Sequence, residues 1–139
     1  MQPKRILVVD DEPDVVETIE VCLALEGYEV LTAANGIDGL NLALTQRPDL
    51  VLLDVMMPGE NGYRVARAIR ESEETAGVVE PVPIILLTAR DLSSDPEREQ
   101  TFLDFSQADL MMYKPFEMDD LVARISGFLG NQEVQSASA

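Results

Sequence analysis

DLVLLDVMMPGENGY, residues 49–63, is the stretch that decides the fold. Its apolar run from Leu50 to Leu53 ends abruptly in Asp54, and a loop with one proline and two glycines follows. This pattern predicts a buried strand that presents a single carboxylate at its C-terminal end. In open α/β sheets, ligands bind in the crevice outside the carboxyl ends of the strands. Asp54 is therefore a candidate functional residue, although an aspartate at a strand end is also a common turn former or helix cap.

Four other apolar runs alternate with helix-like segments along the chain. These runs cover residues 5–9, 28–33, 82–87 and 110–113, and their apolar residues are continuous, which indicates strands buried on both faces. Each of the five runs is followed by a segment with apolar residues at helical spacing. The sequence therefore predicts a doubly wound α/β domain, with a five-stranded parallel sheet between two layers of helices.

Local signals set the limits of the helices. Pro13 is suited to the first turn of the first helix. Ser94 and Glu97 resemble a capping box at the start of the fourth helix, whereas the acidic stretch 71–80 is expected to be a polar connection. Residues 131–139 are small and polar, so we expect a flexible C-terminal tail after a single domain that covers residues 4–130.

Composition limits the chemistry that this domain can perform. With 139 residues and 46% hydrophobic content, the chain fits one domain with its own core. Ten basic residues against 26 acidic ones give a net charge of −16, which argues against direct binding to nucleic acid. The absence of histidine excludes imidazole catalysis and imidazole metal ligands. Cys22 has no disulfide partner, and no apolar run is long enough to span a membrane, so we expect a cytoplasmic protein.

Polar side chains follow four of the five predicted strands. They are Asp10 and Asp11 after the first, Asp54 after the third, Thr88 after the fourth and Lys114 after the fifth. At one edge of a parallel sheet these carboxylates would raise one another's pKa, unless a divalent cation or the lysine neutralised them. Oxygen ligands without histidine or paired cysteines favour Mg²⁺ or Mn²⁺. A carboxylate nucleophile beside such a cation points to phosphoryl chemistry.

Taken alone, each of these residues also has an ordinary structural explanation. Thr88 suits a strand, Lys114 a surface, and the two aspartates near residue 10 a helix cap; five coincident strand-end placements favour a shared site. An aspartyl-nucleophile phosphatase would use the same sheet type, but that class needs an alternating Asp-x-Asp, which residues 10–12 lack. No glycine-rich loop follows the first strand, so dinucleotide or Walker-type phosphate binding lacks its physical basis.

Four segments together resemble the receiver domain of response regulators in two-component signalling. They are ILVVDDE at 6–12, LLDVMMPGENGY at 52–63, IILLTA at 84–89 and KPF at 114–116. The resemblance implies a flavodoxin-like sheet with strand order 2-1-3-4-5. It also implies a metal site for Mg²⁺, in which Asp11 is a direct ligand, Asp10 binds through water, and Asp54 and the backbone carbonyl of Met56 complete the protein's share.

The same resemblance assigns the switching residues and the function. Asp54 would be the phosphoacceptor, Thr88 the switch hydroxyl and Lys114 the phosphate-binding ammonium, with a cis peptide bond before Pro115. The implied protein is a phosphorylation-dependent switch that takes its phosphoryl group from a sensor histidine kinase or a histidine phosphotransfer protein. It catalyses only its own phosphorylation and dephosphorylation, and it changes its surface for a downstream protein that the sequence does not identify. The sequence leaves a homodimer open.

Departures from the family pattern qualify this expectation. Met111 occupies the position of the usual switch aromatic, and we expect Tyr113 to lie on the opposite face of the strand, so a non-switching interaction module is an alternative function. Gln107 replaces a common glycine. Met56 and Arg90 would flank water approaching an acyl phosphate, and because Met56 cannot orient water, we predict slow self-dephosphorylation.

Overall fold

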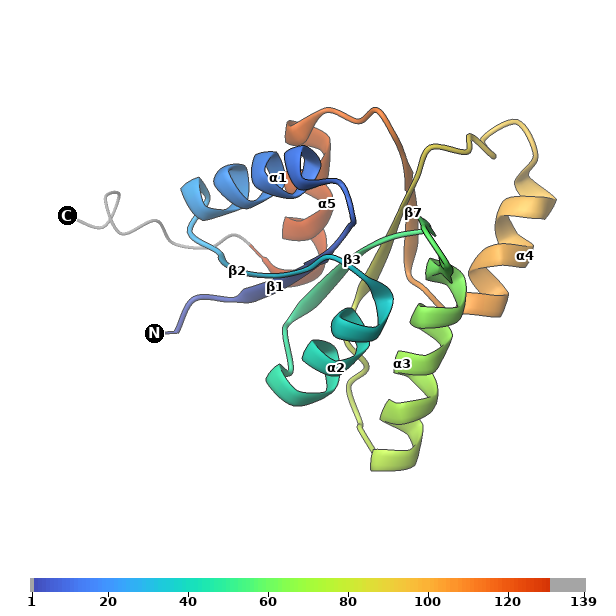
Figure 1. Cartoon of the computed structure of the whole chain (residues 1–139), viewed down its shortest axis with the longest axis horizontal. Coiled ribbons are helices and arrows are strands. Elements are labelled where there is room, and N and C mark those ends of the chain that lie inside the picture. Colours follow the sequence, from blue (N-terminus) through green and yellow to red (C-terminus); the bar gives the residue numbers. More distant parts are fainter. Residues whose placement is uncertain (1, 131–139) are drawn as a thin grey trace.

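Five parallel strands form the central sheet, and each overlaps one of the apolar runs. The computed structural model describes residues 2–130. Its main strands are β1 (Arg5–Val9), β2 (Glu29–Ala33), β3 (Leu50–Asp54), β6 (Ile84–Thr88) and β7 (Leu110–Tyr113). Their order is β2-β1-β3-β6-β7, which confirms the predicted order 2-1-3-4-5 (Figure 1). All lateral pairs are parallel, so the carboxyl ends of the strands meet at one edge.

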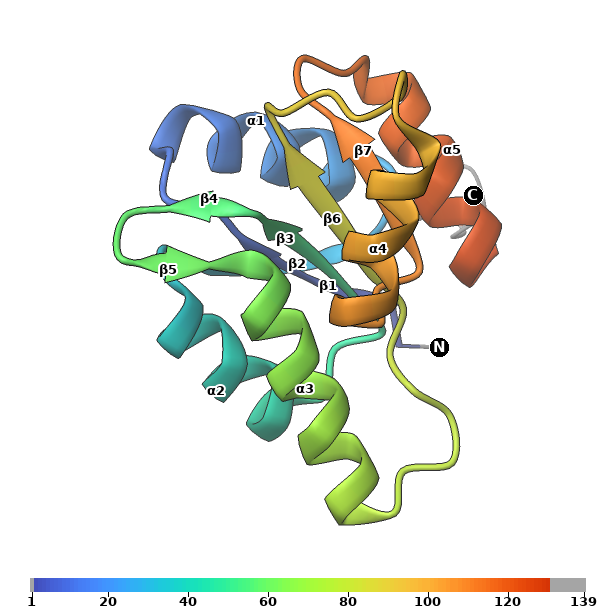
Figure 2. The same cartoon turned by 90° about the vertical axis from the view of Figure 1, so that its right-hand side faces the viewer.

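Helices cover both faces of this sheet, which gives the three predicted layers (Figures 1 and 2). Helices α1 (Pro13–Leu25) and α5 (Met118–Leu129) pack on one face, and α2 (Gly36–Gln46), α3 (Gly62–Ala76) and α4 (Pro96–Ser106) pack on the other. The sheet separates two hydrophobic cores. Alternate strand residues contribute side chains to one core or the other, because successive residues of a strand point to opposite faces. No helix within the described residues is long and apolar enough to cross a membrane.

A short hairpin connects β3 to α3. The strands β4 (Met56–Met57) and β5 (Glu60–Asn61) pair antiparallel within the segment predicted to be a loop. Gly62 follows, and a Cβ atom there would collide with the carbonyl oxygen of Asp54 and lie 2.7 Å from the Cα of Val55. Only glycine lets the start of α3 approach the end of β3 this closely. The hairpin therefore returns the chain directly against the strand that carries Asp54.

The predicted polar connection at 71–80 is wrong in its first half, because α3 continues to Ala76 and ends at Gly77 in the left-handed conformation. The buried guanidinium of Arg70 holds the carboxylate of Glu73 at 2.8 Å, one helical turn on. Glu73 in turn accepts a hydrogen bond at 2.7 Å from the backbone N–H of Val82. Val82 lies before the ladder, and β6 begins at Ile84 and not at residue 82.

The predicted capping box at the start of α4 is also wrong. Asp95 is the N-cap residue, and its side chain accepts a hydrogen bond at 3.2 Å from the backbone N–H of Arg98. Pro96 explains the shift, because proline suits the first position of a helix, so the cap is the residue directly before it, Asp95, one residue later than the predicted Ser94. The predicted tail, residues 131–139, lies outside the described residues.

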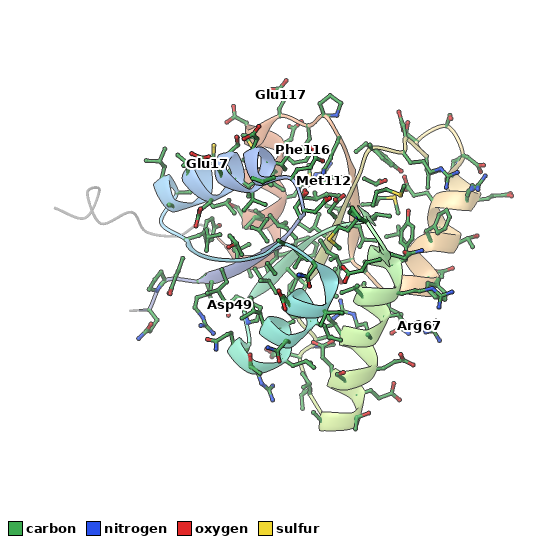
Figure 3. The ribbon with its side chains drawn as sticks, in the orientation of Figure 1. Glu17, Asp49, Arg67, Met112, Phe116 and Glu117 are labelled. Atoms are coloured by element: carbon green, nitrogen blue, oxygen red, sulfur yellow. The ribbon has the colours of Figure 1, made fainter. Side chains whose placement is uncertain are left out.

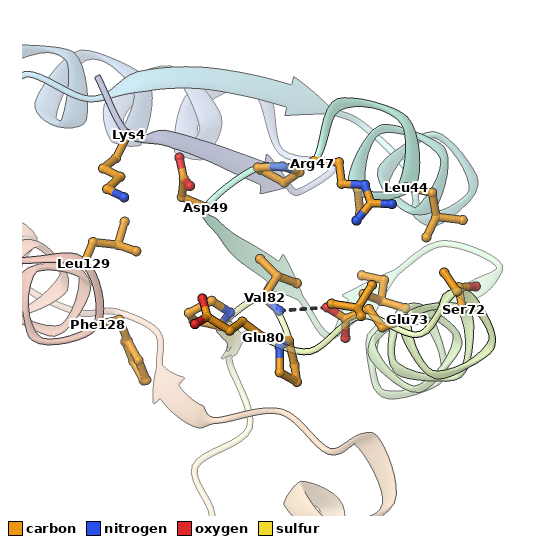
Figure 4. Close-up of a pocket in the computed structure, with 17 residues that line it drawn as sticks. Lys4, Leu44, Arg47, Asp49, Ser72, Glu73, Glu80, Val82, Phe128 and Leu129 are labelled. Atoms are coloured by element: carbon orange, nitrogen blue, oxygen red, sulfur yellow. Dashed lines mark hydrogen bonds between the residues drawn. The ribbon is translucent and has the colours of Figure 1, made fainter. Parts of the chain in front are cut away.

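A pocket lies at the amino edge of the sheet, far from the carboxyl ends of the strands (Figure 4). Lys4, Asp49 and Val82 line it near the starts of the strands, and Phe128 and Leu129 line it from the end of α5. Because parallel strands separate their two ends by the full height of the sheet, this pocket is not part of the edge that carries Asp54.

Gln107 keeps the turn into β7 in a strained conformation. Its φ is 58°, in the left-handed region that glycine adopts without cost. We predict that Gln107→Gly raises the free energy of unfolding by about 0.5–1 kcal/mol. Glycine adopts the left-handed conformation without steric strain, and the free energy gained by removing that strain exceeds the cost of glycine's greater conformational entropy in the unfolded chain. Urea unfolding measures the change. Gln107→Ala is the matched control and should bring no gain; an earlier urea midpoint for the glycine variant would contradict the prediction.

Candidate functional site

Three of the sequence-predicted site residues converge at the carboxyl edge of the sheet. Asp54 ends β3 and is 3% exposed, and Asp10 follows β1 and is 1% exposed. Lys114 follows β7, and its ammonium nitrogen lies 3.0 Å from an oxygen of Asp10 and 3.5 Å from Oδ1 of Asp54. The register of the parallel strands explains the convergence, because β3 lies between β1 and β6 and ends level with them.

A fourth residue, Glu12, completes the contacts of the lysine. Its Oε1 lies 3.4 Å from the ammonium nitrogen of Lys114. The other oxygen of Asp10 accepts a hydrogen bond at 2.9 Å from the backbone N–H of Glu12, so the turn after β1 is fixed by the same aspartate. The sequence predicts no role for Glu12. Its position within the acidic run 10–12 was the available signal.

The surroundings of Asp54 and Lys114 shift the pKa of both groups upward. Burial, together with the negative charge of Asp10, raises the pKa of Asp54 to about 6, against the lowering effect of Lys114. Burial lowers the pKa of Lys114, but the hydrogen bond and charge of Asp10, with the charges of Asp54 and Glu12, outweigh it, so the net shift is upward. Above pH 6 the site is therefore an ionised aspartate beside an ammonium.

Thr88 is fully buried at the end of β6, and its hydroxyl accepts a hydrogen bond at 3.1 Å from the backbone N–H of Arg90. Its carbonyl oxygen accepts a bond at 2.7 Å from the backbone N–H of Lys114, which ties the two strand ends together. The peptide bond between Lys114 and Pro115 is cis, as the resemblance implied.

The donor set fits a divalent cation. Carboxylate oxygens of Asp10, Glu12 and Asp54 all lie within 4.8 Å of one another. Hard oxygen ligands of this kind suit Mg²⁺ or Mn²⁺.

Asp11 is half-buried and is not a member of this group of described acidic residues, so its role as a direct ligand stays a prediction. Met56 is 68% exposed, and its backbone N–H lies 3.4 Å from Asp54 Oδ1; the role of its carbonyl also stays a prediction.

The predicted placement of Tyr113 is wrong. Residues 111 and 113 are two apart in β7 and therefore share a face of the sheet. Met111 belongs to the core beneath α3 and α4, and Tyr113 packs against that same core, whereas Met112 lies in the opposite core. An aromatic side chain is thus present on the face from which the family's switch aromatic acts, but two residues nearer to Lys114.

The model of the response regulator receiver domain family matches residues 6–126, nearly the whole described chain. The chain belongs to this family. The curated relative DNA-binding dual master transcriptional regulator RpaA of Synechocystis sp. is 36% identical over 125 residues, which are 90% of this chain and 48% of the relative. The receiver chain therefore spans about half the length of this relative.

Solved structures agree with the assignment. The chemotaxis protein CheY4 of Vibrio cholerae is similar with a TM-score of 0.78 and 28% identity, over 91% of this chain and 99% of that one. A putative response regulator from Chloroflexus aurantiacus gives a TM-score of 0.76 and 33% identity, over 94% and 100% of the two chains. The beryllofluoride-activated DrrB receiver domain gives 0.76 and 30%, over 92% and 98%.

We predict that removal of the Asp54 charge stabilises the metal-free receiver increasingly as the pH rises from 3.8 to about 6, and fully above that range. The pKa in the folded state, about 6, exceeds the ordinary value of 3.8, so the folded state binds more protons between these values and loses stability as pH rises through them. In EDTA, Asp54→Asn should raise the free energy of unfolding by about 1–3 kcal/mol at pH 7.5 and by far less at pH 4.5. Urea unfolding at both pH values measures this.

The matched control is Asp119→Asn, which removes an exposed charge from the start of α5 and should change little at either pH. Equal effects of Asp54→Asn at the two pH values would contradict the prediction.

Proposed function

We propose that this receiver domain is a phosphorylation-dependent signalling switch with Asp54 as its phosphoacceptor. A carboxylate oxygen of Asp54 forms a bond to phosphorus while the phosphorus–nitrogen bond of a partner's phosphohistidine breaks, and the imidazole leaves with that electron pair. The observation that carries the proposal is the ammonium of Lys114, held 3.5 Å from Asp54 at the carboxyl edge of the sheet. A fixed positive charge at this place stabilises the charge that develops on the phosphoryl oxygens.

The remaining residues support the same reaction. Asp10 and Asp54, with Asp11 and the carbonyl of Met56, would hold Mg²⁺, which supplies additional positive charge to the phosphoryl oxygens when it is bound. The buried hydroxyl of Thr88 would donate a hydrogen bond to one of these oxygens once it turns away from the backbone of Arg90.

Partners follow from the chemistry and the charge. The phosphoryl donor would be a sensor histidine kinase or a histidine phosphotransfer protein in the cytoplasm, because this chain has no histidine of its own. The output would be a protein contact, since a net charge of −16 opposes direct binding to nucleic acid. The non-switching module was motivated by Met111, and the position of Tyr113 on the same face weakens that alternative.

The direct test is intact-protein mass spectrometry after incubation with phosphoramidate, with and without Mg²⁺. We predict that the wild type gains one phosphoryl group only with Mg²⁺, and that Asp54→Asn gains none. Asp119→Asn, which alters an exposed aspartate, should be phosphorylated like the wild type. A wild type that binds Mg²⁺ but gains no phosphoryl group would contradict the proposal, as would a gain retained in Asp54→Asn.

We also predict slow loss of the phosphoryl group, which Met56→Asn should accelerate. Met56 is exposed beside Asp54 and carries no group that can orient a water molecule, whereas an asparagine amide can. An acceleration of roughly tenfold corresponds to a barrier lower by about 1.4 kcal/mol. The decay of the phosphorylated mass after removal of the donor measures the rate. Met56→Leu is the control, and an asparagine variant that decays no faster than this control would refute the prediction.

A further inference from the structure

Tyr113 is the lateral neighbour of Thr88 in the sheet. The register pairs Thr88 of β6 with Tyr113 of β7, whereas Met111 pairs with Leu86, two residues farther from the site. The backbone N–H of the next residue, Lys114, donates to the carbonyl oxygen of Thr88 at 2.7 Å, so the two strand ends are held together. Tyr113 is therefore closer than Met111 to Thr88 along the sheet, and a movement of the Thr88 side chain affects Tyr113 first.

The far end of Tyr113 reaches a different element. Its hydroxyl donates a hydrogen bond to the carboxylate of Glu99 in α4. Burial and this contact with Glu99 raise the pKa of the Tyr113 phenol, so it stays protonated and remains a donor. One side chain thus connects the end of β6, where the switch hydroxyl lies, to a helix on the surface.

Helix α4 buries few of its residues. Within Pro96–Ser106, which the structure describes in full, Ser106 is the only buried residue. Phe102 and Leu103 are only partly buried where they pack against the core. The ring of Phe102 stacks on Tyr63 of α3 at 4.5 Å, and the guanidinium of Arg67 lies 4.9 Å from the centroid of the Phe105 ring. Figure 3 shows Arg67 on the side of α3 that faces α4. With so little buried area, loss of one hydrogen bond matters to the position of α4.

We propose that Tyr113 transmits phosphorylation of Asp54 to α4, with Glu99 as its contact, in place of the residue at position 111. This inference rests on the proposed function. When the hydroxyl of Thr88 leaves the backbone N–H of Arg90 for a phosphoryl oxygen, space opens beside the ring of Tyr113. The ring shifts toward that space, its hydroxyl leaves Glu99, and α4 loses a contact. The surface made by α4 and β7 then differs between the two states, and a partner protein can read that difference.

The chain suits a direct measurement, because it has three tyrosines and no tryptophan. With ¹³C-labelled tyrosine rings, NMR should give three ring environments, each assigned by a Tyr→Phe variant. Tyr28 lies in the opposite core and serves as the internal reference. We predict that Mg²⁺ with beryllofluoride shifts the Tyr113 signal and leaves that of Tyr28 in place. Glu99→Gln should shift the Tyr113 signal before activation.

A second measurement separates transmission from mere structure. Hydrogen exchange of the α4 amides should become faster when beryllofluoride binds to the wild type and to Met111→Leu, and this response should be lost in Tyr113→Phe. Tyr113→Phe should still be phosphorylated on Asp54, because the phenol touches none of the reacting groups. A stationary Tyr113 signal with beryllofluoride bound, or an α4 response that Tyr113→Phe keeps and Met111→Leu loses, would overturn this inference alone. If beryllofluoride fails to bind, the proposed function falls and this inference falls with it.

Discussion

One ammonium group shared among three carboxylates is the constraint on which the site depends. Lys114 lies within 3.5 Å of oxygens from Asp10, Glu12 and Asp54, two of which are almost fully buried. Without the lysine, these negative charges would face one another in a poorly solvated edge of the sheet. Even with it, the pKa of Asp54 stays raised to about 6. The cluster therefore favours the binding of additional positive charge, which the proposed phosphoryl transfer onto Asp54 would use.

The rest of the structure keeps this cluster in place and connects it to the surface. The parallel sheet brings the ends of β1, β3 and β7 to one edge, and Gly62 lets α3 begin directly against the strand that carries Asp54. Helices α1, α3 and α5 bury apolar side chains in the core, whereas α4 packs only partly buried Phe102 and Leu103 against it and adds stacking and polar contacts. A rigid site beside a weakly held helix is the arrangement expected of a switch, because the least stable element is the one that moves.

Much of this was readable from the sequence, and the failures have physical causes. Continuous apolar runs identified the strands, and the polar residues that end them identified Asp10, Asp54 and Lys114 as neighbours. Side-chain contacts across the chain were not readable: within α3, which continues to Ala76, Glu73 accepts a hydrogen bond from the N–H of Val82, two residues before β6 begins. Pro96 moved the cap of α4 by one residue. The face of Tyr113 followed from simple strand alternation, and the expectation that placed it opposite Met111 misapplied that rule.

The central claim is that Lys114 holds the site ready for a phosphoryl group on Asp54. The measurement that tests it most directly is a crystal structure of the protein with Mg²⁺ and beryllofluoride. The account predicts beryllofluoride bonded to a carboxylate oxygen of Asp54, with the ammonium of Lys114 and the hydroxyl of Thr88 each in contact with a fluorine atom. Beryllofluoride bound elsewhere, or bound to Asp54 while Lys114 stays on Asp10 alone, would contradict it.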